Sequence, residues 1–143
     1  MDIRQKLTQV VENGHAVTRL VARGFIDPKN LGATVQMAKL AEAYGPQATM
    51  AIMGGRRYAD LPAVVDERGT LTYQQVDDMS WALAHGLQEL GVTQGSVVGL
   101  LCRDHRGLII AMAACGKLGA RLVLMNTGFA KPQFAEVCAR EGV

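Results

Sequence analysis

The chain has 143 residues, the size of one ordinary domain, and 49% of them are hydrophobic. That content is enough to form a core without disulfide or metal staples. A formal net charge of +2 and an aromatic content of 5% give no indication of a nucleic-acid partner. The amino terminus is polar, and no apolar run reaches the length of a membrane span. We therefore expect a cytoplasmic protein with no transmembrane segment.

The cysteines and histidines show no metal or redox pattern. The cysteines are odd in number, lack a CxxC pair and lie in apolar contexts, so we interpret them as small buried hydrophobes. The histidines are interpreted as isolated residues without a ligand at the spacing that zinc sites use. We expect no metal site from these residues: Cys102, Cys115 and Cys138, and His15, His85 and His105.

A helical hairpin is predicted over residues 1–46. Apolar residues recur at helical spacing from Ile3 to Val21, and Gly24 ends this first helix. Asn30 is the predicted cap of a second helix, which Gly45 and Pro46 terminate. The apolar stripe of this hairpin is expected to pack on the main body, and contact with a membrane surface is the alternative.

A linker is predicted over residues 47–61, because the apolar patch there is short and two glycines follow it. The adjacent Arg56 and Arg57 fit a solvated loop, with an anion contact as the alternative. A β-hairpin follows, with strands at 63–66 and 70–72 joined by a turn at 67–69.

An amphipathic helix begins after Thr72, which forms a predicted capping box with Gln75. Asp77 and Asp78 suit the positive end of the helix dipole, and a metal or acid/base carboxylate pair is the alternative. Trp81 and His85, four residues apart, are expected to pack on the surface, with a ledge formed by the two rings as the alternative. The predicted buried stripe consists of Val76, Met79, Leu83, Leu87 and Leu90.

A βαβ unit follows this helix. The strand at 97–102 has no polar alternation, which is typical of a parallel strand buried on both faces. Asp104 is the predicted cap of a helix that is apolar on nearly every side. Gly116 and Gly119 bracket the end of that helix and lead into a second parallel strand at 121–125.

A polar turn, Asn126 to Gly128, follows the second strand at the edge where open α/β sheets bind ligands. We interpret it as a plain turn, with a phosphate-binding nest as the alternative. A last helix carries Phe134, Val137 and Cys138 on one face, and another strand is expected after it. The predicted fold class is α/β, with a partial parallel sheet, βαβ crossovers and a β-hairpin after an N-terminal helical hairpin.

Two motifs at a defined spacing resemble one family. LTYQQV at 71–76 and GKLGARLVLMNT at 116–127 are similar to the first conserved segments of the adenylate-forming acyl-CoA ligases, the AMP-dependent synthetases that include fatty-acid-CoA ligases. The resemblance covers about residues 56–143. It implies that residues 62–143 form a partial AMP-binding domain, an incomplete N-terminal lobe of such an enzyme.

The resemblance also implies a reaction and its cofactors. A fatty acid and ATP, with magnesium, would give an acyl-adenylate and pyrophosphate, and CoA would then displace AMP. Ala59 and Asp104 depart from residues common in the family, and Gln75 replaces a Glu while keeping the capping box. The family's Ser-, Thr- and Gly-rich phosphate loop and its C-terminal domain have no counterpart among these residues. We therefore assign no catalytic, cofactor-binding or metal-binding residue.

Two interpretations from different functional classes remain open. The chain is either an N-terminal fragment of a fatty-acid-CoA ligase, inactive alone, or a non-catalytic interaction module derived from that lobe. The first predicts bare apolar faces and self-association through an exposed sheet edge. A stable monomer that melts cooperatively would favour the second. A free-standing nucleotide-binding domain is disfavoured, because no phosphate-binding motif is present.

Overall fold

The computed structural model describes residues 14–19, 21–22 and 31–143. The chain divides into two compact units, residues 1–39 and 40–143. In the first unit, residues 14–19 and 21–22 are helical, and helix α2 begins at Leu31. Most of the first predicted helix, the connection after it and the Asn30 cap lie outside the described residues.

Helix α2 extends over Leu31–Tyr58 and changes direction at Gly45, whose φ of 73° and ψ of 171° are not helical. The prediction that the helix ends here is confirmed, but the prediction of an irregular segment after it is wrong. A second helical stretch starts at once, with Pro46 in its first turn, where proline needs no amide hydrogen. The Thr49 hydroxyl donates to the Gly45 carbonyl oxygen at 2.7 Å. The domain boundaries at residues 46 and 61 stay a prediction.

The two glycines that suggested a linker mark a close helix contact instead. A Cβ at Gly54 would overlap the ring of Tyr73, and one at Gly55 would lie 3.1 Å from the Cβ of Asp77. Small residues therefore let the second half of α2 lie against the start of the next helix. The inner face of this half is buried through Ala48, Thr49, Ala51, Ile52 and Met53.

The predicted hairpin is confirmed, with strand β1 at Pro62–Asp66 and strand β2 at Gly69–Thr72 in antiparallel register. Helix α3, Tyr73–Glu89, starts directly after it. The predicted capping box is present: the Gln75 amide donates to the Thr72 hydroxyl at 3.2 Å, and the Thr72 amide donates to the Gln75 side chain at 2.8 Å. These bonds satisfy two amides that would otherwise lack partners at the helix start.

The buried face of α3 differs from the predicted stripe. Val76 is buried as expected, but the face continues through Ser80 and Ala84, while Met79 and Leu83 are exposed. Small side chains at Ser80 and Ala84 allow a neighbouring helix to approach closely, and Ser80 also accepts a hydrogen bond from Lys117 of that helix. Leu90, at the helix end, is also exposed and Leu87 is half-buried.

Strand β3 (Val97–Leu101), helix α4 (Arg106–Leu118) and strand β4 (Arg121–Met125) form the predicted βαβ unit, with β3 and β4 parallel. The predicted cap, Asp104, is wrong, because the helix starts one residue later. His105 caps it instead, and its Nδ1 accepts a hydrogen bond from the Gly107 amide at 2.9 Å. Gly119 ends the helix in the left-handed conformation, with a φ of 68°.

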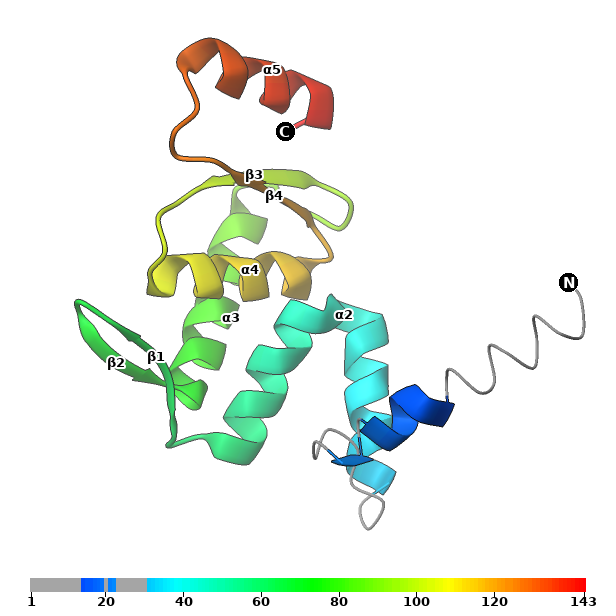
Figure 1. The fold of residues 1–143 in the computed structure, drawn as a ribbon. Helices are drawn as coiled ribbons and strands as arrows, with labels where there is room; N and C mark the ends of the chain where they lie inside the picture. Colours follow the sequence, from blue (N-terminus) through cyan, green and yellow to red (C-terminus); the bar gives the residue numbers. More distant parts are fainter. Residues whose placement is uncertain (1–13, 20, 23–30) are drawn as a thin grey trace, which may run out of the picture. The chain divides into compact units, whose positions relative to one another are not determined.

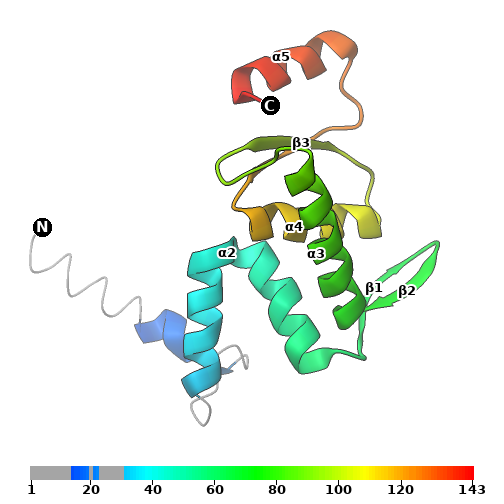
Figure 2. The same ribbon diagram turned by 180° about the vertical axis from the view of Figure 1, so that it is seen from behind.

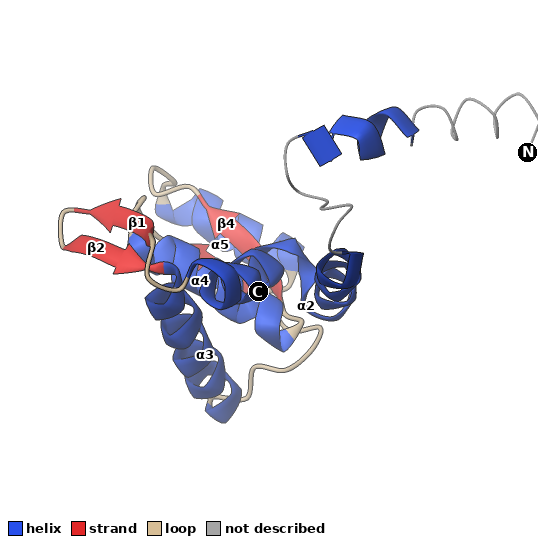
Figure 3. Cartoon of the chain, turned by 90° about the horizontal axis from the view of Figure 1, so that it is seen from below, coloured by secondary structure: helices blue, strands red, loops and turns tan. Residues whose placement is uncertain are grey.

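Helix α4 is covered on most sides by the rest of its unit, although Ile109 is exposed, whereas the β3–β4 sheet is less covered. α4 contacts α3, β1 and both strands of the sheet, and Figures 1 and 2 show the sheet between α4 and the last helix, α5 (Lys131–Glu141). The strands are only partly covered, and Leu101 and Leu124 are exposed. The expectation of a strand buried on both faces is therefore wrong for this chain. The hairpin and the β3–β4 pair are separate two-stranded sheets, and Figure 3 shows the hairpin strands apart from β4.

An ion pair joins the hairpin to α4. The Asp66 carboxylate, at the end of β1, accepts a bond from Arg106 Nε at 2.9 Å and another from the Arg106 backbone amide at 3.0 Å. Both side chains are largely buried, with 7% of Asp66 and 15% of Arg106 exposed. The hydrogen bonds from Arg106 hold the pKa of the Asp66 carboxyl well below its usual range. They link residues 40 positions apart and fix the hairpin on the start of the helix.

A second ion pair joins α3 to α4. Lys117 is fully buried, and its Nζ donates to Asp77 Oδ1 at 2.6 Å, to Ser80 Oγ at 2.7 Å and to the Asp77 carbonyl at 2.9 Å. All three ammonium hydrogens are thus used. Nζ also lies 4.4 Å from the centre of the Trp81 ring. Burial lowers the pKa of Lys117, and the bond from Asp77 offsets part of that effect.

We predict that Asp66→Asn makes the free energy of unfolding depend less steeply on pH in acid. The folded-state pKa of Asp66 is lowered, so its contribution is present above the unfolded value of about 4 and is lost as the pH falls below it. The free energy of unfolding, measured by urea titration between pH 7 and pH 2, should fall less steeply below pH 4 in this variant. Asp60→Asn, at an exposed position, is the matched control. An unchanged slope in Asp66→Asn would contradict the prediction.

We predict that Asp77→Leu destabilises the fold by about 3 to 5 kcal/mol, because it leaves the Lys117 ammonium buried without its counter-charge. Adding Lys117→Met should restore most of the lost stability, since no charge then remains buried. The lowered pKa of Lys117 also means that wild-type stability rises as the pH approaches 10.5, the ordinary pKa of lysine. Lys117→Met should lack that rise. A double variant no more stable than Asp77→Leu would refute this account.

Candidate functional site

The carboxyl end of the β3–β4 sheet is the first place to look for a site. The parallel register pairs Leu101 with Met125, so the segments that follow the two strands start side by side. Ligands of open α/β sheets bind at this edge. Asn126 accepts a bond from the Gly128 amide at 2.8 Å on its side-chain oxygen. The hydrogen bond within the turn therefore uses the Gly128 amide, which is not available to a phosphate.

Cys102 and His105 come together at the same edge, three residues apart in sequence. Cys102 Sγ lies 3.4 Å from His105 Nε2 and donates to the Arg103 carbonyl at 3.3 Å. Because Nδ1 of His105 accepts the Gly107 amide, the neutral ring carries its proton on Nε2 and cannot act as a base toward the thiol. The prediction that His105 is isolated is wrong. The spacing of the two residues was the signal that could have revealed the pair.

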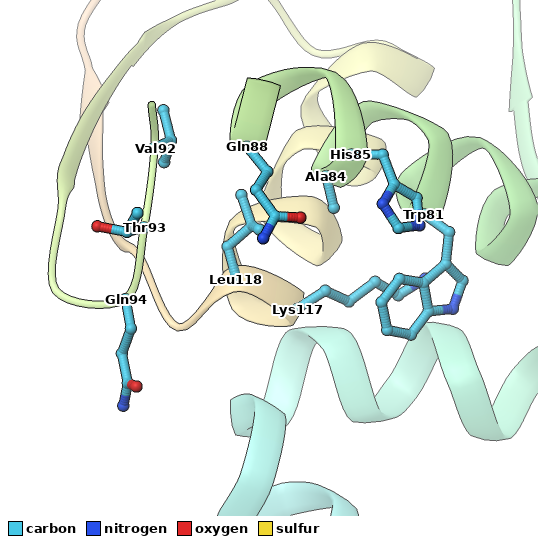
Figure 4. Close-up of a pocket in the computed structure, with 9 residues that line it drawn as sticks. All are labelled: Trp81, Ala84, His85, Gln88, Val92, Thr93, Gln94, Lys117 and Leu118. Atoms are coloured by element: carbon cyan, nitrogen blue, oxygen red, sulfur yellow. The ribbon is translucent and has the colours of Figure 1, made fainter. Parts of the chain in front are cut away.

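A cavity of about 310 Å³ lies between α3, the end of α4 and the loop before β3. Figure 4 shows Lys117 extending beside the Trp81 ring, with the His85 ring next to it. Trp81 meets Tyr44 edge-on, with 6.0 Å between the ring centres, and the tilted His85 ring lies 6.2 Å from Trp81. The two residues of α3 therefore lie side by side, as in the alternative interpretation of a ledge. Because Lys117 has used its three donors, it has none left for a ligand in this cavity.

A second cavity, of about 290 Å³, is lined mostly by apolar residues. It lies where α2, the hairpin, α3 and α4 meet, and Gln47 and Tyr73 are the polar residues of its lining. It lacks the convergent charged groups that orient a polar substrate. Its apolar walls are Met50, Ala51, Ala63, Val64, Val76, Ile109, Met112 and Ala113.

The other candidate residues make contacts that stabilise the fold or lie exposed at its surface. Asp77 lies in the second turn of α3 and pairs with Lys117, so it acts neither through the helix dipole nor with Asp78. Arg56 and Arg57 are exposed in the last turn of α2, where cations complement the helix dipole. Two serines are also engaged in hydrogen bonds: the Ser80 hydroxyl accepts from Lys117, and the Ser96 hydroxyl accepts from the Thr93 amide at 3.0 Å.

The cysteines are all free, and only Cys115 is fully buried; burial raises the pKa of its thiol. Cys102 and Cys138 are half-buried. In the part of the chain that the structure describes, no three His, Cys, Asp or Glu side chains are grouped so that they could hold a metal ion. Across the same described ranges, no helix combines the length and apolar character needed to cross a membrane.

Comparison with protein families gives one match that covers more than half of the chain. Residues 53–143 match the AMP-binding enzyme family. The chain is 34% identical over 84 residues to the nonribosomal peptide synthase roqA of Penicillium rubens, covering 59% of this chain and 4% of that protein. It is 42% identical over 67 residues to the medium/long-chain-fatty-acid–CoA/3-oxocholest-4-en-26-oate–CoA ligase of Mycobacterium tuberculosis, covering 47% of this chain and 12% of the ligase.

Solved structures share this fold. The Klebsiella oxytoca NpsA N-terminal subdomain, in complex with anthranilyl-AMSN, matches with a TM-score of 0.64 and 25% identity, over 67% of this chain and 25% of that one. The fatty acyl CoA synthetase of Mycobacterium tuberculosis matches with a TM-score of 0.64 and 26% identity, over 67% of this chain and 20% of that one.

The chain thus spans a quarter or less of each of these relatives. The mixed α/β architecture is that of N-terminal subdomains in adenylate-forming enzymes. Its relatives include both fatty-acyl-CoA ligases and adenylation domains of peptide synthetases. The chain belongs to the AMP-binding enzyme family, and its residues correspond to an N-terminal part of an adenylate-forming enzyme.

Proposed function

We propose that this chain is part of a fatty-acid-CoA ligase and that it is inactive alone. The observation that carries the proposal is the 42% identity with the mycobacterial ligase, compared with 34% for the roqA synthase. Many enzymes of one fold act on different substrates, so the family alone does not specify the acid. The higher identity, over an alignment of 67 residues compared with 84 for roqA, supports the fatty-acid branch.

The reaction of the complete enzyme has two steps. A fatty-acid carboxylate attacks the α-phosphorus of ATP and releases pyrophosphate, which leaves an acyl-adenylate. The CoA thiolate then attacks the acyl carbon and releases AMP, which leaves a thioester. Magnesium and basic groups are needed to offset the phosphate charge in the first step.

Three groups that could have met a phosphate are already engaged in contacts within the chain. At the carboxyl end of the sheet, the Gly128 amide is already bonded to Asn126, and Lys117 is buried with its donors used. Arg106 is held by Asp66. We therefore assign no catalytic role within this chain. Its contribution is a scaffold: the two ion pairs and the packing of α4 fix the hairpin, α3 and the parallel strands.

A non-catalytic module is the second candidate, and the exposed apolar side chains at the sheet favour it as much as they favour a part of an enzyme. The two candidates differ in one respect. A non-catalytic module need not function inside a ligase. A part of a ligase, in contrast, should support activity when it replaces the equivalent segment of a related ligase.

A segment exchange tests this difference. Residues 53–143 replace the equivalent segment of the Mycobacterium tuberculosis fatty acyl CoA synthetase, and a matched chimera carries the equivalent roqA segment instead. Fatty-acid-dependent ATP–pyrophosphate exchange and thioester formation are measured. We expect the first chimera to retain activity within about tenfold of the parent, a barrier change of about 1.4 kcal/mol. We expect the roqA chimera to lose at least about tenfold more, and the isolated chain to show no exchange.

A folded first chimera without activity, or equal activity in both chimeras, would contradict the proposal. Thermal melting compares the fold of each chimera with that of the parent. Exchange by the isolated chain would show that it holds catalytic residues of its own.

A further inference from the structure

The cavity between α3, the end of α4 and the loop before β3 has the size and the lining of a small-molecule site. Its volume of about 310 Å³ is at the lower end of the range of such pockets, about 300–1,000 Å³. Its loop residues lead into β3, and Lys117 and Leu118 end the helix that leads into β4. The cavity therefore lies at the amino end of both parallel strands, opposite the edge where open α/β sheets bind substrates. We call it the amino-end cavity.

The aromatic wall of the amino-end cavity is held in place before any ligand binds. Lys117 Nζ lies 4.4 Å from the centre of the Trp81 ring, and Tyr44 meets the same ring edge-on, with 6.0 Å between the ring centres. Lys117 is itself fixed by hydrogen bonds to Asp77 and Ser80. A ligand ring that packs against Trp81 does not have to order this side chain, so the entropy cost of binding is lower.

Gln88 supplies the polar group that is free to orient a ligand. His85 and Gln88 are exposed on α3, and Figure 4 shows both side chains extending from that helix near Lys117 of α4. Across the described residues, no hydrogen bond engages the side-chain amide of Gln88. This amide offers a donor and an acceptor in one plane. A ligand with a complementary pair of groups can therefore form two hydrogen bonds with it.

The charges around the amino-end cavity select a neutral ligand. Among the described residues that line it, Lys117 alone carries a formal charge at pH 7, and its three ammonium hydrogens are used within the chain. An anion would meet no free cationic donor there, and it would face the carboxyl end of α4, where the helix dipole is negative. A cation would be repelled by the Lys117 ammonium, which already lies over the Trp81 ring.

We propose that the amino-end cavity binds a neutral aromatic carboxamide, with its ring against Trp81 and Leu118 and its amide paired with that of Gln88. Aromatic rings meet favourably edge-to-face or offset, so the fixed indole gives the ring a defined place. The apolar side chains of Ala84 and Val92 also line the space that the ring would fill. This site is separate from the proposed function, because its lining lies at the other end of the sheet from the expected substrate edge.

Titration of the full chain with benzamide, followed by amide proton–nitrogen NMR spectra, tests the proposal. The chain has one tryptophan, so a single indole N–H signal reports on Trp81, and side-chain NH₂ signals report on Gln88. We expect both sets of signals to shift saturably with benzamide. Benzoate and benzamidine have nearly the same shape but carry a charge, and each should bind at least about tenfold more weakly, because neither charge finds a partner.

Substitutions at Gln88 test the role of its amide. Gln88→Leu should weaken benzamide binding about tenfold, the loss expected for about two hydrogen bonds, and should not weaken the binding of toluene, which has no amide. Gln88→Glu should bind benzamidine at least about tenfold more tightly than the natural chain does, because a carboxylate and an amidinium form two charge-assisted hydrogen bonds. Gln74→Leu is the matched control, since Gln74 is exposed on α3 outside the lining, and it should leave every affinity unchanged.

Three results would overturn the proposal: no saturable shift of the indole signal with benzamide, equal affinities for benzamide and benzoate, or benzamide binding that Gln88→Leu leaves unchanged. The backbone amide signals of each variant show whether its fold is kept, which is expected because Gln88 is exposed. Tighter binding of benzamidine by Gln88→Glu is a gain that an unfolded chain would not show.

Discussion

Close packing around α4 is the constraint on which the rest of the structure depends. A Cβ at Gly116 would lie 2.9 Å from the Tyr44 carbonyl oxygen and 3.0 Å from the Ala48 Cβ, so only glycine allows α2 to approach α4 this closely. On the adjacent face, Lys117 bonds Asp77 and Ser80 of α3. Because interiors are packed like crystals, these contacts fix the spacing of three helices together.

Burial is uneven between α4 and the β3–β4 sheet. α4 is covered by α2, α3, the hairpin and one face of the sheet, and Arg106 at its start is held by Asp66. The two parallel strands, in contrast, keep exposed leucines and unpaired edges. In NpsA, three quarters of the N-terminal subdomain lie outside the match. The matched fold is therefore part of a larger body there, which gives a physical reason for the uncovered strands.

Local chemistry made part of the fold predictable from sequence. The capping box of Thr72 and Gln75, the hairpin turn and the apolar βαβ run each depend on neighbouring residues, and the structure confirms them. The errors arose where tertiary contacts decide. Gly54 was interpreted as part of a linker, but it leaves room for the Tyr73 ring against helix α2. Ser80 is buried in α3, where it bonds Lys117. The partnership of Lys117 with Asp77 joins positions 40 apart, which no local pattern indicates.

Native-state hydrogen exchange tests the central claim most directly, because it measures the opening free energy of each amide. Our account predicts the slowest exchange in α4 from Ile110 to Lys117, at the free energy of global unfolding. It predicts faster exchange, through smaller openings, for the amides that pair β3 with β4. Strand amides as slow as those of α4 would show that the sheet is complete by itself and would contradict the account.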